Sequence, residues 1–238
     1  MIPAHHLSKE DIPEIPPEVT GEDLDRRVRA ALGSLEPDYA DRVARHLVMC
    51  ARLLDSDPEL AYRHARTAAD RAGRIDVVRE AAGIAAYATG RYAEAIRELR
   101  TYVRLSGDTD CLPVIADCER GLGRPERAID IAGSAEAKRL EGDPRTEMAI
   151  VLAGARADLG EHAAGLAVLS RAGRLAETSD GAERVALARE RIEALATGVD
   201  REQADWMEQD APGAEGEGSD EAYEMDGVTL FDAEEGSW

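Results

Sequence analysis

Residues 83–107 read GIAAYATGRYAEAIRELRTYVRLSG, which is two runs of helical periodicity separated by a short turn. Before the turn at Gly90, small and apolar residues recur at helical spacing around Gly83. After the turn, Tyr92, Ala95 and Leu99 recur three to four residues apart. Apolar residues at this spacing predict an amphipathic helix, and a glycine just past such a run predicts its end. Residues 83–107 therefore predict a helical hairpin.

Similar turn signals recur at regular intervals along the chain. Turn signals lie at 55–58, 89–92, 122–125 and 159–162, which gives spacings of 34, 33 and 37 residues. Each is followed within a few residues by a small residue, namely Ala61, Ala95, Ala128 and Gly165. A second set of breakers falls between the turns. A single helical hairpin cannot bury both of its faces, so a period of this length predicts hairpins that stack and share a core.

These residues resemble the tetratricopeptide repeat family. The best-matching unit carries the family's small residue at Gly83, its turn glycine at Gly90 and the aromatic Tyr92. Later units match at their turn glycines, Gly123 and Gly160, whereas the first unit has Ser56 where that glycine belongs. The resemblance implies an α-solenoid of about four hairpins with capping helices and a concave binding groove.

The composition supports an all-α chain. Apolar residues make up 44% of the sequence but aromatic residues only 4%, and 42 alanines supply much of the difference. Alanine and leucine suit closely packed helices, whereas strands favour aromatic and β-branched side chains. There is no collagen period and no apolar run long enough to span a membrane, so those classes are excluded.

Three segments are predicted along the chain. Residues 1–19 contain four prolines and are expected to form a flexible, extended arm. Residues 20–197 are expected to form the repeat domain, with helices at 21–33 and 182–196 as its caps. Residues 198–238 hold 14 acids and one base, a charge of −13, and are expected to be disordered.

Charge and cysteine usage limit the partners and the compartment. Residues 20–197 carry a net charge of only −4 and no basic stripe, which argues against nucleic acid or anionic membrane as a partner. The three cysteines are an odd number and are not closely spaced in pairs, and the amino terminus lacks the features of a secretory signal. A cytoplasmic location is therefore expected. Arginine outnumbers lysine by 27 to 2, which suggests a bacterial, high-GC genome.

The sequence nominates no catalytic centre. It contains no phosphate-binding loop, nucleophile elbow, HExxH or CxxC motif, so a non-catalytic protein without metal or cofactor is expected. His46 and Cys50 lie four residues apart, which is the minimum for a metal pair or an activated thiol. A small-molecule or metal-dependent activity there is the alternative. Cys111 and Cys118 share a helix face but are expected to be buried structural thiols.

The groove is the main candidate for function. The resemblance assigns it to the first helix of each unit and implies these lining residues: His46, Cys50, Leu53, Glu80, Ile84, Tyr87, Asp117, Arg120, Ile150 and Asp158. The family's carboxylate clamp of lysine and asparagine has no counterpart among them, so a chaperone-tail partner is not expected. The mixed apolar and polar character fits a helix or an extended peptide of another protein. The alternative is that these side chains form ordinary solvated surface and bind no partner.

The acidic tail contains large apolar side chains that a solubilising segment does not need. They are Trp206, Val228, Leu230, Phe231 and Trp238. Three interpretations stay open: an inert tail, a linear motif for another protein, which could be a basic one, or a segment that folds back on its own groove. Aromatic anchors often dominate interfaces, and a tether raises the effective concentration of a self-docking segment.

Overall fold

The structure is a computed structural model that describes residues 12–198. Within that range it contains ten α-helices, three short 3₁₀ helices and no strand, so the prediction of an all-α chain is confirmed. The α-helices are α1 (Arg26–Ala31), α2 (Pro37–Leu53), α3 (Pro58–Ala72), α4 (Asp76–Ala88), α5 (Tyr92–Ser106), α6 (Leu112–Gly121), α7 (Pro125–Ala132), α8 (Gly142–Asp158), α9 (His162–Leu175) and α10 (Ser179–Ala196). The 3₁₀ helices are η1 (Gly21–Asp23), η2 (Leu32–Ser34) and η3 (Ala137–Arg139).

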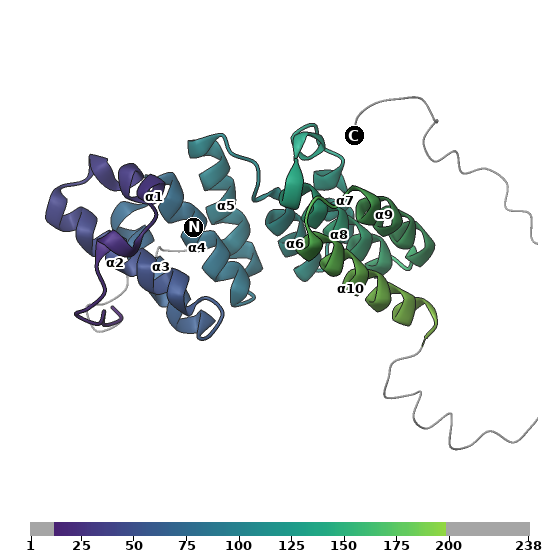
Figure 1. The fold of residues 1–238 in the computed structure, drawn as a ribbon, viewed down its shortest axis with the longest axis horizontal. Coiled ribbons are helices and arrows are strands. Elements are labelled where there is room, and N and C mark those ends of the chain that lie inside the picture. The colour runs from purple at the N-terminus through teal and green to yellow at the C-terminus, as the bar shows by residue number, and fades with distance from the viewer. Residues whose placement is uncertain (1–11, 199–238) are drawn as a thin grey trace, which may run out of the picture.

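The helices pack in sequential pairs. The pairs α2–α3, α4–α5, α6–α7 and α8–α9 each consist of two helices in contact across a short turn, and α10 packs against α8 and α9. Each pair also touches the next one along the chain. Figure 1 shows α1–α5 in one half of the molecule and α6–α10 in the other, with the link from α5 to α6 between them.

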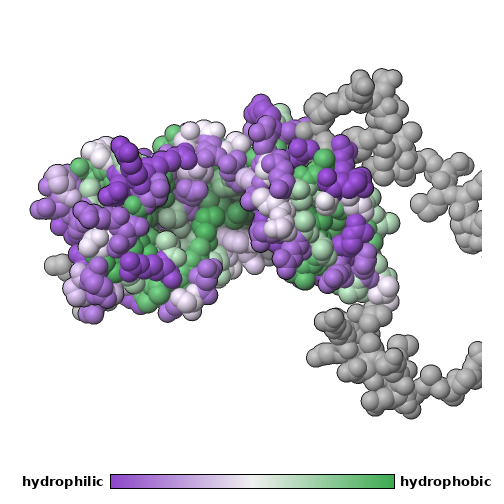
Figure 2. All heavy atoms as spheres, viewed as in Figure 1, coloured by the Kyte–Doolittle hydropathy of each residue, from purple (hydrophilic) through white to green (hydrophobic). Residues whose placement is uncertain are grey.

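The surface seen in Figure 2 is not uniformly polar. Hydrophobic residues gather in a hollow in the middle of the α1–α5 half, and hydrophilic side chains border them. A further hydrophobic area lies over the helices of the other half. Apolar areas of this kind, rimmed by polar residues, are a feature of interaction surfaces.

Glycines end the first helix of three pairs in the same way. Gly90, Gly123 and Gly160 have φ of +72°, +71° and +79°, a conformation that glycine adopts readily because it has no Cβ. At the first of them, the N–H of Gly90 donates to the carbonyl of Tyr87, and the N–H of Arg91 to that of Ala86. This pair of bonds is a Schellman motif, and it satisfies carbonyls that the helix end leaves without partners.

Small residues let the paired helices approach closely. A Cβ added to Gly83 of α4 would lie 2.5 Å from Cγ of Leu99 in α5, and one added to Gly165 of α9 would lie 2.8 Å from the carbonyl oxygen of Ala153. The anchors Ala61, Ala95 and Ala128 have no exposed surface.

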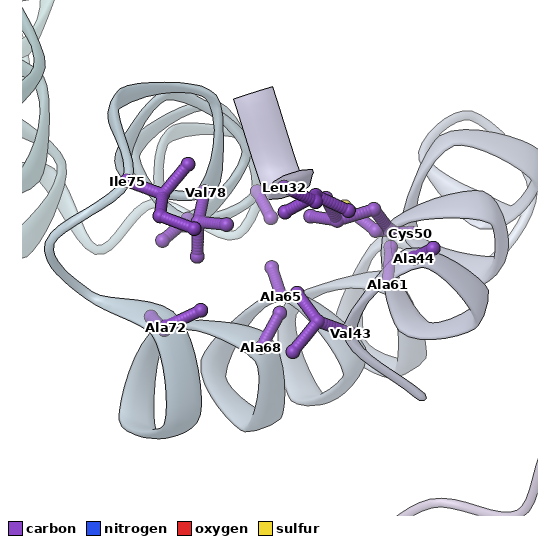
Figure 3. Close-up of a cluster of buried hydrophobic side chains, with 14 residues drawn as sticks. Leu32, Val43, Ala44, Cys50, Ala61, Ala65, Ala68, Ala72, Ile75 and Val78 are labelled. Atoms are coloured by element: carbon purple, nitrogen blue, oxygen red, sulfur yellow. The ribbon is translucent and has the colours of Figure 1, made fainter. Parts of the chain in front are cut away.

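Alanine carries the core of the α2–α3–α4 region. Ala61, Ala65, Ala68 and Ala72 recur along α3, and Figure 3 shows them facing larger side chains such as Val43. Alanine leaves little side chain between the helices, so neighbouring backbones come close while the bulkier residues of α2 and α4 fill the remaining space. The alanine content of the sequence therefore reflects helix-on-helix packing.

Residues 12–19, the described part of the predicted arm, contain no helix and lie against α2. Pro17 and Glu18 form a turn, in which the N–H of Val19 donates to the carbonyl of Pro16. Val19 is only 2% exposed and packs on Val48 and Met49, and Nε of Arg45 donates to the carbonyl of Val19 at 2.8 Å. Burial of these apolar side chains and the arginine bond hold the segment in place.

The single helix expected over 21–33 is divided. Thr20 caps η1 with Asp23 in a capping box, and a new cap at Asp25 then starts α1, whose last residues run into η2. Leu32 is 2% exposed and joins the core of α2–α4, so this region does cover the end of the helical array.

Candidate functional site

Four of the predicted groove residues meet in one polar network across α4, α6 and α8. The hydroxyl of Tyr87 donates to Oδ2 of Asp117 at 2.7 Å, and Nη1 of Arg120 donates to Oδ1 of the same carboxylate at 2.7 Å. Arg120 also donates two hydrogen bonds to Asp158, from Nε to Oδ2 at 2.8 Å and from Nη2 to Oδ1 at 3.2 Å. The guanidinium of Arg120 thus links α6 to α8, and the bond from Tyr87 to Asp117 joins α4 to them.

The absence of a side chain at Gly154 makes room for this arginine. A Cβ at Gly154 would lie 2.6 Å from Cζ of Arg120. Burial lowers the pKa of Arg120, but the carboxylates of Asp158 and Asp117 raise it by more, so the net shift is upward. Burial, followed by the bond to Asp117, raises the pKa of Tyr87. Arg120 therefore stays cationic and the Tyr87 hydroxyl stays protonated around neutral pH.

An open hollow of about 600 Å³ lies over the network. Its walls come from the ends of α5, α6, α7 and α8 and from α10: Tyr92, Asp117, Arg120, Gly121, Gly123, Pro125, Glu126, Asp158 and Arg191. Tyr92 packs where a Cβ on Gly121 would collide with its ring, at 2.4 Å. Arg191 and Glu126 are exposed, and neither forms an ion pair within residues 12–198. Within that range, the hollow thus offers one unpaired cation and one unpaired anion.

The remaining predicted residues of α4 and α8 are on the same helices as Tyr87 and Asp158. Ile84 and Ile150 are half-buried. Ile84 packs against the apolar cluster around Leu99, and Ile150 packs against the one around Leu169. Glu80 is also half-buried, and burial, with the charge of Asp108 second, raises the pKa of its carboxyl. These residues supply apolar surface together with a carboxyl that is easier to protonate than usual.

His46 and Cys50 do not line a groove, which corrects the prediction for α2. Both are 5% exposed and lie in the interior, where Nδ1 of His46 is 2.9 Å from Nδ1 of His64. Burial raises the pKa of the Cys50 thiol to about 11, which disfavours the reactive thiolate. Leu53 is half-buried beneath the amino-terminal segment. Val19, with Ile15 and Leu24, packs on the Val48–Met49 side of α2, whereas Cys50 packs into the core shared with α3 and α4.

The described residues contain no group of three His, Cys, Asp or Glu side chains that could hold a metal ion. Cys111 and Cys118 are buried, and their pKa values are raised to about 12, chiefly by burial. Protonated, buried thiols behave as small apolar side chains.

The sequence interpretation missed the contribution of α10. Leu195 is 53% exposed, whereas Val185 and Ile192 of the same helix are only 3% and 4% exposed. Leu187 is 67% exposed, and Arg191 between the two leucines lines the hollow. Their spacing of four residues, which puts all three on one side of the helix, was visible in the sequence.

Comparisons find no family model, no curated protein and no solved structure that matches the chain. None of the helices described is both long and apolar enough to cross a membrane. The predicted tail motif of Trp206, Val228, Leu230, Phe231 and Trp238 lies outside the described residues.

Proposed function

We propose that the chain is a non-catalytic adaptor or scaffold that binds a segment of another protein along the surface shared by α4, α6, α8 and α10. In this proposal the four helical pairs form a tetratricopeptide-like solenoid, and the shared surface is its concave groove. The network of Tyr87, Asp117, Arg120 and Asp158 is the observation that carries the proposal.

The network supports binding because it preforms the surface. Ordering polar side chains at an interface costs free energy when a partner binds, and a surface that is already ordered avoids that cost. Arg120 is held on both sides by carboxylates, so its position does not depend on a ligand. The neighbouring hollow gives a partner room without rearrangement of the helices.

The side chains around the network indicate what kind of segment fits. Ile84, Ile150, Leu187 and Leu195 offer apolar contacts, while Arg191 and Glu126 offer one charge of each sign. A helix or an extended peptide with apolar anchors flanked by charged residues complements such a surface. We expect a segment of this kind rather than a uniformly charged one.

No observation favours the alternative activity at His46 and Cys50. A substrate or metal would have to reach two side chains that are 5% exposed, between α2 and α3. Burial lowers the pKa of His46 to about 4 and raises that of Cys50 to about 11, so both groups are neutral at pH 7. That state suits a packed interior.

Selection of short peptides against the full-length protein tests the proposal. The selected peptides are then measured by calorimetry against the protein and against Ile150→Arg. Loss of a buried apolar contact of about 1.5–3 kcal/mol weakens binding roughly tenfold or more. Arg174→Ser, on the exposed surface of α9, is the control and is expected to bind as the parent does. The proposal is wrong if the Ile150→Arg protein retains the parent's affinity, or if no peptide binds.

A further inference from the structure

Helix α10 presents an apolar stripe that nothing within the described residues covers. Leu187 and Leu195 are 67% and 53% exposed, more than any other large apolar side chain described. Arg191 lies midway between them on the same side of the helix and has no ion-pair partner in residues 12–198. The stripe therefore reads apolar, cationic, apolar.

The stripe departs from the polar outer surface expected of a capping helix. The end of a helical array requires a polar outward face, and two exposed leucines in line with Glu183 and Arg191 interrupt it. Arg191, in the middle of the stripe, lines the hollow beside Asp158. Contacts between α8 and α10 fix this orientation, because Arg184 bonds Glu147 and Thr178 bonds Asp143.

We infer that residues 231–238, FDAEEGSW, dock on the Leu187–Arg191–Leu195 stripe of the same chain. The segment has the complementary order: Phe231 and Trp238 are apolar, and Glu234 and Glu235 lie between them. In a helix, the seven-residue separation of the two aromatic residues spans about 10.5 Å, close to the roughly 12 Å between residues eight apart on α10. The aromatic rings cover the leucines and a glutamate pairs with Arg191.

The connection between the two partners favours this occupant. The chain leaves α10 at Gly198, three residues after Leu195, and residues 199–230 join that point to Phe231. A random coil of 32 residues has an end-to-end distance of roughly 30 Å, so a connection of this length can reach the stripe. Tethering gives an effective concentration in the millimolar range, so even a weakly binding segment occupies its site.

Tryptophan fluorescence of the full-length protein tests the docking itself. Trp206 and Trp238 are the only tryptophans, so Trp206→Phe leaves Trp238 as the single reporter. We expect blue-shifted emission that acrylamide quenches poorly and that does not change on dilution. In the same background, Leu187→Ser/Leu195→Ser is expected to shift emission to the red and increase quenching. Leu105→Ser/Leu175→Ser replaces two other exposed leucines, 41% and 45% exposed, and is expected to leave emission unchanged.

Several results would overturn the inference. Water-exposed Trp238 in the parent means that the segment does not dock, and a shift that disappears on dilution means that a second copy of the chain occupies the stripe. An equal effect of both leucine pairs means that the response is not specific to α10. Circular dichroism of each variant confirms that the helices remain folded. Peptide binding that depends on Ile150 is measured separately, so failure of the docking leaves the proposed function standing.

Discussion

His46 of α2 and His64 of α3 share one hydrogen bond in the interior, with their Nδ1 atoms 2.9 Å apart. One Nδ1 donates and the other accepts, so the bond requires that at least one ring is neutral. Nε2 of His64 is buried without a partner within the described part of the chain. Burial lowers both pKa values to about 4, with smaller contributions from His64, Arg71 and Arg45 on His46 and from Arg63 on His64.

This pair makes folding stability depend on mildly acidic pH. In the unfolded chain the histidines take up protons near their ordinary pKa of 6.5, whereas in the folded protein they do so near 4. The unfolded state thus binds more protons between these values, and stability is lost as pH falls from about 6.5 to about 4. At pH 5 the loss is on the order of 2 kcal/mol for each histidine.

Urea unfolding at pH 7.5 and pH 5 measures this loss. His46→Gln/His64→Gln is expected to reduce the difference in unfolding free energy between the two pH values, because glutamine does not titrate. His162→Gln, at the start of α9, is the matched control and should retain the pH dependence. A pH dependence that survives in the double variant would contradict this account of the pair.

Adding a methyl group at the α4–α5 crossing should destabilise the fold. The Cβ of Gly83→Ala would lie 2.5 Å from Leu99, so helices that are in contact must separate. Overpacking of this kind costs about 1–3 kcal/mol, which thermal or urea unfolding detects. Gly133→Ala, whose Cβ would meet nothing closer than 3.5 Å, is the control. Equal stability of the two variants would show that the α4–α5 crossing can accommodate the extra methyl group.

The turn glycines should resist substitution for a different reason. Gly123 has nothing within 4 Å of an added Cβ, but its φ of +71° is unfavourable for alanine. Gly123→Ala is expected to cost about 1–2 kcal/mol in unfolding free energy. At Gly33, which is equally open but has no positive φ, alanine should leave stability unchanged or slightly higher. The contrast separates backbone strain from crowding.

A double-mutant cycle tests whether the polar network acts as a unit. Arg120→Gln, Asp158→Asn and their combination should show a coupling energy of about 0.5–1 kcal/mol in unfolding, because Arg120 is only 24% exposed. The Arg139–Glu136 pair is the reference: its atoms are 4.0 Å apart and its side chains 72% and 52% exposed, so its coupling should be near zero. Similar values for the two pairs would argue against a preformed network.

Of the predicted groove residues, those in the middle of the chain form one polar network, whereas His46 and Cys50 at its start are buried. Tyr87, Asp117, Arg120 and Asp158 come together because glycine turns of the same geometry follow α4, α6 and α8, which keeps equivalent residues in register. His46 stands in the first unit, where Ser56 replaces the glycine. That unit has an additional neighbour, the segment around Val19, which no repeat pattern contains.

By itself, the sequence determined that residues 20–197 are helical and where α4, α6 and α8 end, because glycine conformation and apolar periodicity act over a few residues. It did not determine which side of each helix faces a neighbour. The side of α2 that is covered depends on residues far away in sequence that pack on Met49, and the exposure of Leu195 on α10 depends on how Val185 and Ile192 pack against α8 and α9. A helix can turn about its axis without breaking its own hydrogen bonds, so only tertiary packing selects the buried side.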